Sequence, residues 1–237
     1  MRPATVPHGA VVVGIDERRS GCAARAWANT VATKERRPLV VTRAPHPARV
    51  LGSLSERAHL VVVGAGQRGS DSALVRRSRC PVVVVPDDVG HGHGVVVGIG
   101  GVPGSLGTVE FAFHTASLLG EPLIVVHCYQ EAERMSGRAL VSPPHSDLAE
   151  ERLLVAETLA GLRPGYPEVA VGVRLERGLP EDVLGDLAHD AALVVVGETR
   201  HGLLTDLVLG SVARSLLARG SCPVAVVPRP GPATLGP

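Results

Sequence analysis

Short, continuous apolar runs alternate along this chain with longer stretches in which apolar residues recur at helical spacing. Apolar runs of this length fit strands buried on both faces, as in parallel sheets. The runs predict strands at 10–15, 38–42, 60–64, 82–85, 94–99, 122–128, 168–175, 193–197 and 223–227. The stretches between them predict helices at 20–34, 47–58, 70–78, 104–119, 146–162, 180–189 and 211–219. Alternating strands and helices indicate an α/β fold with right-handed crossovers.

The same series of runs occurs twice, which indicates two copies of one unit. The landmarks are the runs at 11–15, 60–64 and 80–82, which return at 95–99, 193–197 and 222–224, offset by 84, 133 and 142 positions. The offset grows, so the second copy carries insertions of 49 and 9 residues between these landmarks. We therefore predict four strands in the first copy and five in the second.

The copies define two domains, at 8–86 and 94–229, joined by a linker at 87–93 that is rich in turn-forming residues. The tail at 230–237 is rich in Pro and Gly and is expected to be disordered. The last strand of each domain would leave an unpaired edge. We expect these two strands to pair with each other inside the chain, and a homodimer is a further candidate assembly.

Composition excludes several classes of partner. The formal net charge is +1 and aromatic residues make up 2% of the chain, which argues against nucleic-acid binding. The apolar runs are too short to span a bilayer, and residues 1–10 contain no apolar stretch of signal-peptide length. We therefore expect a cytoplasmic protein with no membrane partner.

The sequence also limits the chemistry. Lys34 is the single lysine, and no Gly-Lys-Ser/Thr phosphate-binding loop exists. The four cysteines show no CxxC spacing, and Cys80 and Cys222 stand at matched repeat positions, where we expect small core residues. His91 and His93 offer two metal ligands without a partner cluster, so a linker is the simpler interpretation. His127 lies within a strand and is expected to satisfy a backbone group.

The loop after the strand at 193–197 could hold an anion. It begins at Gly197 and ends at Gly210-Ser211, where a helix begins. Ligands of open α/β sheets lie beyond the carboxyl ends of the strands, and a helix N-terminus favours an anion there. The structural alternative is that Gly197 only ends a strand and Ser211 is an N-cap. The local residues leave both interpretations open.

The chain carries the order Val-Val-Gly, loop, Gly-Ser, helix and Cys-Pro-Val. In this order it resembles the universal stress protein (UspA-like) family in its tandem two-domain form, and the resemblance extends over almost all of residues 8–229. The resemblance implies Rossmann-like open parallel sheets of strand order 3-2-1-4-5, the first trimmed to about four strands. It also implies a non-enzymatic stress-response function. Members of the family that bind ATP carry Gly-x-x-Gly-x9-Gly-Ser/Thr after the fourth strand and an Asp after the first.

The motif carries over only in part. In the second domain Gly197, Gly210 and Ser211 match it, whereas Arg200 replaces the second glycine and Gly100 stands where the Asp is expected. The first domain keeps the acid as Asp16, but its loop at 64–70 is too short to wrap a triphosphate. The resemblance thus implies ATP as a candidate cofactor in the second domain alone, with no catalytic or metal residues. The implied binding residues are Ile99, Gly100, Cys128, Val196, Gly197, Arg200, Gly210 and Ser211.

Three functional hypotheses remain. The leading one is a non-enzymatic cytoplasmic universal stress protein that binds adenine nucleotide weakly in its second domain. The alternative is a dimerisation or interaction scaffold with a degenerate pocket. The third is an ATP-dependent enzyme of the same general fold, which would need a Ser-Gly-Gly-x-Asp-Ser type of loop after the first strand, and residues 100–105 do not supply it.

Overall fold

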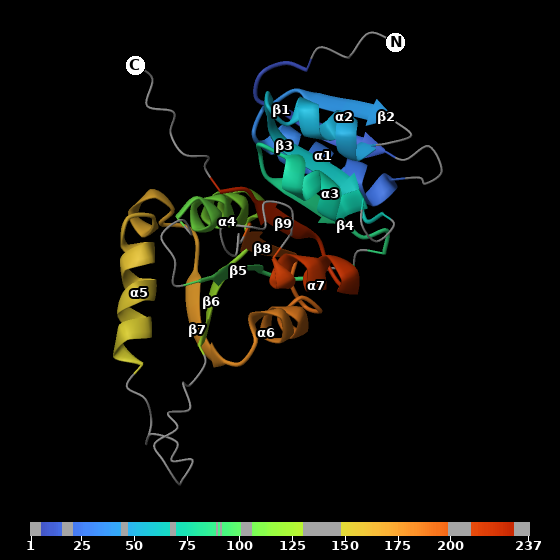
Figure 1. Cartoon of the computed structure of the whole chain (residues 1–237). Helices are drawn as coiled ribbons and strands as arrows, with labels where there is room; N and C mark the ends of the chain where they lie inside the picture. The colour runs from blue at the N-terminus through green and yellow to red at the C-terminus, as the bar shows by residue number, and fades with distance from the viewer. Residues whose placement is uncertain are drawn as a thin grey trace, which may run out of the picture.

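The computed structural model describes residues 6–15, 21–43, 47–66, 70–88, 90, 92–100, 106–129, 148–198 and 210–229 (Figure 1). Its strands are β1 (Ala10–Ile15), β2 (Leu39–Arg43), β3 (Ala58–Gly64), β4 (Val82–Val85), β5 (Val95–Ile99), β6 (Leu123–Tyr129), β7 (Val171–Arg177), β8 (Leu193–Gly197) and β9 (Val224–Val227). Its helices are α1 (Cys22–Lys34), α2 (Pro47–Leu54), α3 (Ser70–Arg77), α4 (Leu106–Leu119), α5 (Ala149–Ala160), α6 (Pro180–Leu187), α7 (Ser211–Arg219) and the short 3-10 helix η1 (Arg163–Gly165).

All the predicted strands and helices are present, with ends that differ by a few residues, whereas η1 was not predicted. The largest difference is at α2, which was expected to reach residue 58 and ends at Leu54. The buried Ser55 explains this end. Its hydroxyl donates to the carbonyl of Gly52 at 2.6 Å and accepts from the N–H of Arg79 at 2.9 Å. The first bond satisfies a carbonyl in the last turn of α2 that has no intrahelical partner, and the second ties this helix end to the segment after α3.

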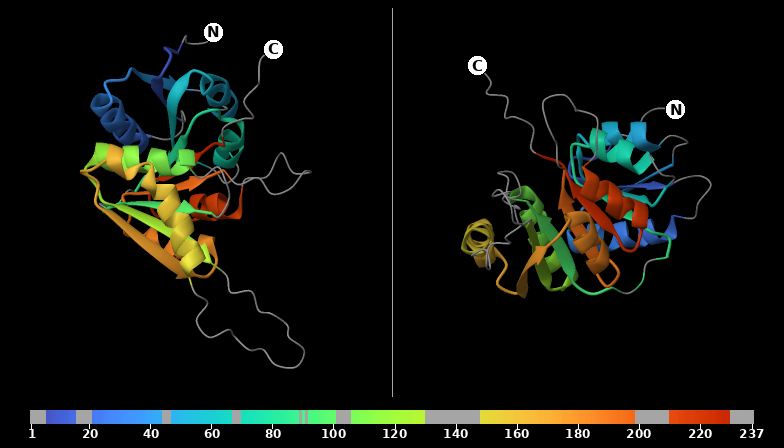
Figure 2. Two further views of the ribbon diagram at one scale, coloured as in Figure 1. Left: turned by 90° about the vertical axis from the view of Figure 1, so that its left-hand side faces the viewer. Right: turned by 60° about the horizontal axis from the view of Figure 1, so that its bottom comes forward.

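The strands form one nine-stranded sheet in the order β2-β1-β3-β4-β9-β8-β5-β6-β7 (Figures 1 and 2). All pairs are parallel except β4 and β9, which run antiparallel through Val82↔Val226, Val83↔Ala225 and Val84↔Val224. We call residues 6–88, which contain β1–β4, the first half. Residues 92–229, which contain β5–β9, are the second half. Taken alone, the second half has its third, second, first, fourth and fifth strands in that spatial order. The seam between the halves is the β4–β9 pair.

Each face of this sheet carries its own apolar core, because alternate residues of a strand point to opposite faces. One core contains Val11, Val13 and Ile15 of β1 and is covered by α1, α4 and α5. The other contains Ala10 and Val12 of the same strand and is covered by α2, α3, α6 and α7. Helices α1 and α4 come from different halves. Both pack on the same core, so they lie on one face of the sheet on either side of the seam.

The repeat is visible in matched close contacts. A Cβ atom at Gly14 would lie 2.5 Å from Cδ1 of Leu51 in α2, and one at Gly98 would lie 2.6 Å from Cδ1 of Leu184 in α6. Both leucines are fully buried. In each half a bare glycine in the first strand therefore lets the second-face helix approach the sheet closely.

The end of the predicted linker packs on the second half. The N–H of His93 donates to the carbonyl of Asp190 at 2.7 Å, and the N–H of Gly94 donates to the carboxylate of Glu121 at 2.8 Å. A Cβ atom at Gly92 would lie 2.1 Å from the carbonyl oxygen of Ala191. Residues 92–94 are thus fixed against the segments that precede β6 and β8, while residue 91 lies outside the described part of the chain.

The matched cysteines are core residues, as predicted. Cys80 and Cys222 are buried just before β4 and β9, and each thiol lies near the carbonyl of the following proline, at 3.6 and 3.3 Å. Burial raises the pKa of each thiol to about 11.

This burial predicts selective alkylation. The raised pKa alone lowers the thiolate fraction at pH 8 by about 100-fold for Cys80 and Cys222, and packing slows the reaction further. We expect iodoacetamide to modify the exposed Cys22 of the native protein and to reach Cys80 and Cys222 only in urea. Peptide mass spectrometry measures this. Equal labelling of Cys80 and Cys22 without urea would show that the β4 end of the sheet opens readily.

Candidate functional site

The carboxyl ends of β5, β6 and β8 lie side by side in the second half. Ile99 at the end of β5 is in register with His127 of β6, and Ile99 and Gly197 each lie two residues beyond the last recorded β5–β8 pair, Val97↔Val195. The sheet order therefore brings together five of the predicted residues at one edge: Ile99, Gly100, Cys128, Val196 and Gly197.

Only part of this set can offer side chains to a ligand. Ile99 and Val196 are buried in opposite cores, so only their backbone can face the edge. Gly197 is required by packing, because a Cβ atom there would lie 2.8 Å from Oγ1 of the buried Thr108 of α4. Gly100 is exposed. The edge thus consists mainly of backbone at two glycines, with the half-buried Cys128 beside them.

Helix α7 supplies the N-terminus at this edge, since a helix that connects two parallel strands begins at their carboxyl end. Gly210 is its N-cap, with φ −54° and ψ 150°, and Ser211 is its exposed first residue. The interpretation of Ser211 as the N-cap is therefore wrong. Within the described residues no side chain caps this helix, so its first turn presents backbone N–H groups and the positive end of the dipole.

Negative charge surrounds the β6 side of the edge. Burial, followed by the charges of Glu176 and Glu181, raises the pKa of the Cys128 thiol. Glu198 directly follows β8 and is half-buried, and its N–H donates to the carbonyl of Val227 at 2.8 Å. Among the residues described at this end of the sheet, the start of α7 is the place that favours an anion.

Some predicted residues lie outside the described part of the chain. Arg200 belongs to the segment 199–209, and Asp16 of the first half belongs to 16–20. The tail at 230–237 is outside it as well. The roles assigned to these residues stay predictions.

The structure confirms the interpretation of His127 and places two further histidines, His93 and His189. The ring of the buried His127 donates from Nδ1 to the carbonyl of Ile99 at 3.2 Å, which confirms that it satisfies a backbone group. His93 is paired through Nδ1 with a carboxylate oxygen of Glu121 at 2.6 Å. His189 is exposed at the end of α6.

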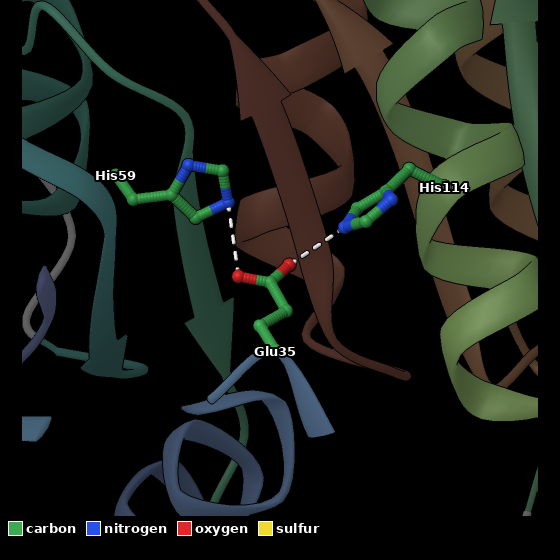
Figure 3. A group of neighbouring side chains, drawn as sticks. All are labelled: Glu35, His59 and His114. Atoms are coloured by element: carbon green, nitrogen blue, oxygen red, sulfur yellow. Dashed lines mark hydrogen bonds and ion pairs between the residues drawn. The ribbon is translucent and has the colours of Figure 1, made fainter. Parts of the chain in front are cut away.

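Another group of side chains, which was not predicted, meets at the junction of the halves and consists of Glu35, His59 and His114 (Figure 3). The three residues are far apart in the chain and follow no motif spacing. No sequence signal points to them, because only the pairing of the two halves brings them together.

A cavity of about 340 Å³ lies elsewhere, between α5, η1 and β7, lined by residues that include Arg152, Leu159, Arg163 and Val173. None of the predicted binding residues lines it. This cavity lies beside β7, the outermost strand of the second half. It is therefore separate from the candidate site at the carboxyl ends of β5 and β8. Among the described residues no helix is both long enough and apolar enough to cross a membrane.

The fold matches solved structures at low sequence identity. A universal stress protein from Archaeoglobus fulgidus DSM 4304 aligns over 93% of this chain and 87% of its own, with a TM-score of 0.58 and 17% identity. A putative universal stress protein from Pseudomonas aeruginosa UCBPP-PA14 aligns over 93% of this chain and 83% of its own, with a TM-score of 0.60 and 18% identity. These similarities concern the fold alone.

Sequence relatives are closer. Universal stress proteins of Mycobacterium bovis and of Mycobacterium tuberculosis H37Rv are each 35% identical over 199 residues, which covers 76% of this chain and 65% of each relative. The chain thus spans less than two thirds of their length. The model of the universal stress protein family matches residues 93–228, which is more than half of the chain and nearly the whole second half. With the α/β fold and the mostly parallel sheet, this match shows that the chain belongs to the universal stress protein family.

Proposed function

We propose that this universal stress protein is a non-enzymatic cytoplasmic stress-response factor whose second half binds an adenine nucleotide weakly, with ATP as the leading candidate. One observation carries the nucleotide part. The strand ends at Gly100 and Gly197 and the uncapped start of α7 at Gly210 all lie at the carboxyl edge of the sheet. Bare backbone at a helix N-terminus suits phosphate.

The expected binding is weak for two reasons. Gly100 has no side chain, so the hydroxyl–carboxylate hydrogen bond that an Asp would make, worth roughly 1.5–3 kcal/mol, is missing. Glu176 and Glu181 add negative charge near Cys128. We expect a dissociation constant on the order of 0.1–1 mM, which corresponds to about 4–5.5 kcal/mol of binding free energy.

The proposal contains no catalytic step. Within the described part of this edge, the ring of His127 is buried and bonded to the carbonyl of Ile99, and the thiol of Cys128 has a raised pKa. Both features oppose the activation of a nucleophile by a base.

The test is a calorimetric titration with ATP of the wild type and of two variants at the α7 N-cap. Gly210→Asp and Gly210→Asn both supply a good capping side chain, so both are expected to fold. The carboxylate repels phosphate and the amide does not, so we expect Gly210→Asp to weaken ATP binding by about tenfold relative to Gly210→Asn. Equal binding by the two variants would place the phosphates away from α7.

A gain of affinity is expected from Gly100→Asp, which places the missing acid at the end of β5. The new hydrogen bond should tighten ATP binding by about tenfold or more, and Gly100→Asn serves as the uncharged control.

The continuous sheet favours a second candidate, an interaction scaffold without a nucleotide. The last strand of the first half, β4, pairs with the last strand of the second half, β9. The first half can therefore act as a pairing partner of the second. Absence of heat and of any thermal shift at millimolar ATP in the wild type would remove the nucleotide proposal and leave this scaffold.

A further inference from the structure

Three side chains from three different elements meet where the halves join. Glu35 directly follows α1, His59 is the second residue of β3, and His114 lies in α4 of the second half. Nε2 of His114 is 2.7 Å from Oε1 of Glu35, and Nε2 of His59 is 3.1 Å from Oε2. Figure 3 shows the carboxylate between the two imidazole rings, both of which direct a nitrogen toward it.

This set has the chemistry of a zinc site. Two imidazole nitrogens and one carboxylate are the protein ligands of a common open zinc site, which keeps its fourth position for water. One ligand atom from each residue lies within 4.8 Å of the others. Tetrahedral coordination at about 2.0–2.2 Å places ligand atoms about 3.3 Å apart, so small side-chain rotations suffice.

The surroundings leave a path for an ion. The side chain of Glu35 is 6% exposed, whereas those of His59 and His114 are 30% and 42% exposed. The carboxylate is therefore largely screened from water while both rings border the solvent. Hydrated cations can reach the rings, and the buried carboxylate would bind a cation in a region of reduced dielectric.

One cation already competes at this position. Nε of Arg37 donates to Oε2 of Glu35 at 2.8 Å, and its Nη1 donates to the carbonyl of Gly9 at 3.1 Å. The Arg37 side chain is 37% exposed, so it can swing toward solvent. A metal ion would either bind Oε1 of Glu35 while Arg37 stays on Oε2, or displace the guanidinium of Arg37 from Oε2.

Protons compete as well. The hydrogen bond to Glu35 raises the pKa of His114, opposed by burial and by Arg37, with Glu110 adding to the rise. Burial alone would raise the pKa of Glu35, but the hydrogen bonds and charges of His114 and His59 leave it well below its ordinary value. Zinc binds deprotonated imidazole nitrogens and a carboxylate, so a metal ion and protons would compete for these three side chains.

We propose that Glu35, His59 and His114 form a divalent transition-metal site of the zinc class that links the two halves of the protein. The site joins α1 and β3 to α4 on one face of the sheet. It lies beside the hydrogen bond from Nζ of Lys34 to the carbonyl of Leu118, at 2.6 Å, another contact between these helices. Bound metal would reinforce the seam in addition to the β4–β9 pair.

The experiment titrates the 237-residue chain, untagged and chelator-treated, with Zn²⁺ by calorimetry at pH 7.5 and follows the melting temperature. Wild-type protein should bind about one equivalent, melt at a higher temperature with zinc, and give the absorption of a tetrahedral N/O site with Co²⁺. Glu35→Gln, His59→Ala and His114→Ala should each weaken Zn²⁺ binding by about 100-fold or more, since even outer-shell changes typically cost 10–100-fold.

Two controls separate a metal site from a purely structural ion pair. His93→Ala removes a histidine that is also paired with a carboxylate, Glu121, and should leave the Zn²⁺ affinity unchanged. Arg37→Gln removes the competing cation and should tighten zinc binding several-fold, although it breaks a contact of the metal-free protein. Metal-free melting temperatures show whether each variant is folded.

The proposal is wrong if wild-type protein shows no saturable binding up to about 1 mM Zn²⁺, a concentration that detects even weak sites. It is equally wrong if the three ligand variants bind zinc as the wild type does. Neither result bears on the nucleotide proposal, because the carboxyl edge of β5 and β8 shares no residue with this cluster.

Discussion

Replacement of Val83 by Asp is expected to cost more than about 4 kcal/mol of folding free energy, a large fraction of the roughly 5–15 kcal/mol that stabilises an ordinary domain. Val83 is fully buried at the centre of β4, opposite Ala225 of β9. An unpaired carboxylate there would lose its hydration without gaining a partner, which costs several kcal/mol. The measurement is urea unfolding followed by circular dichroism.

The matched control for this prediction is Val41→Asp. Val41 is 43% exposed on the edge strand β2, so its new carboxylate stays hydrated and the cost should be within about 1 kcal/mol. If Val83→Asp fails to fold, Val83→Ala provides a milder measurement, with an expected cost of about 2 kcal/mol. Equal effects of the two Asp variants would show that β4 and β9 do not form a buried seam.

The second large effect is expected from Phe113→Ala, at about 3–5 kcal/mol. Phe113 in α4 is the largest of the fully buried side chains among the described residues. Its ring stacks on Tyr166 with centroids 5.5 Å apart and an interplanar angle of 27°, a contact worth about 0.5–1.5 kcal/mol beyond the area that it buries. The truncation would leave a cavity between α4 and the segment after η1.

Phe111→Ala is the control for this substitution, because the same atoms are removed from a ring that is only partly buried against the same core. Its cost in urea unfolding should be less than half that of Phe113→Ala. Similar costs for both variants would contradict the described packing of α4. The result matters for the candidate nucleotide site, since α4 also carries Thr108, which packs under Gly197.

The elements themselves could be predicted from local pattern. Strands β1, β4 and β8 begin and end as the Val runs indicated, and α7 spans the predicted residues. The repeat also placed Cys80 and Cys222 correctly in the core. Strand and helix periodicity are properties of neighbouring residues, so a single sequence is sufficient for them. The end of α2 was predicted less well, and Ser55, which follows this helix, bonds to the N–H of the distant Arg79.

The candidate nucleotide site could be predicted only in part. The strand ends at Ile99 and Gly197 are neighbours as expected, because the family resemblance implied a strand order in which β5 and β8 are adjacent. The start of α7 at Ser211 was predicted correctly, and the open alternative that Ser211 is the N-cap was wrong, because both Gly and Ser are acceptable caps and backbone geometry decides between them. The reason for Gly197, the hydroxyl of Thr108 beneath it, could not be seen without the packing of α4.

The sequence by itself determined the nine strands, the helices between them and the alternation that gives each face of the sheet an apolar core, because these follow from side-chain spacing along the chain. The tertiary structure decided how the two units meet. The antiparallel pairing of β4 with β9 sets α1 and α4 on the same face, and this brings Glu35 and His59 to His114. Such a cluster depends on the relative placement of three separate elements, which no local pattern of residues encodes.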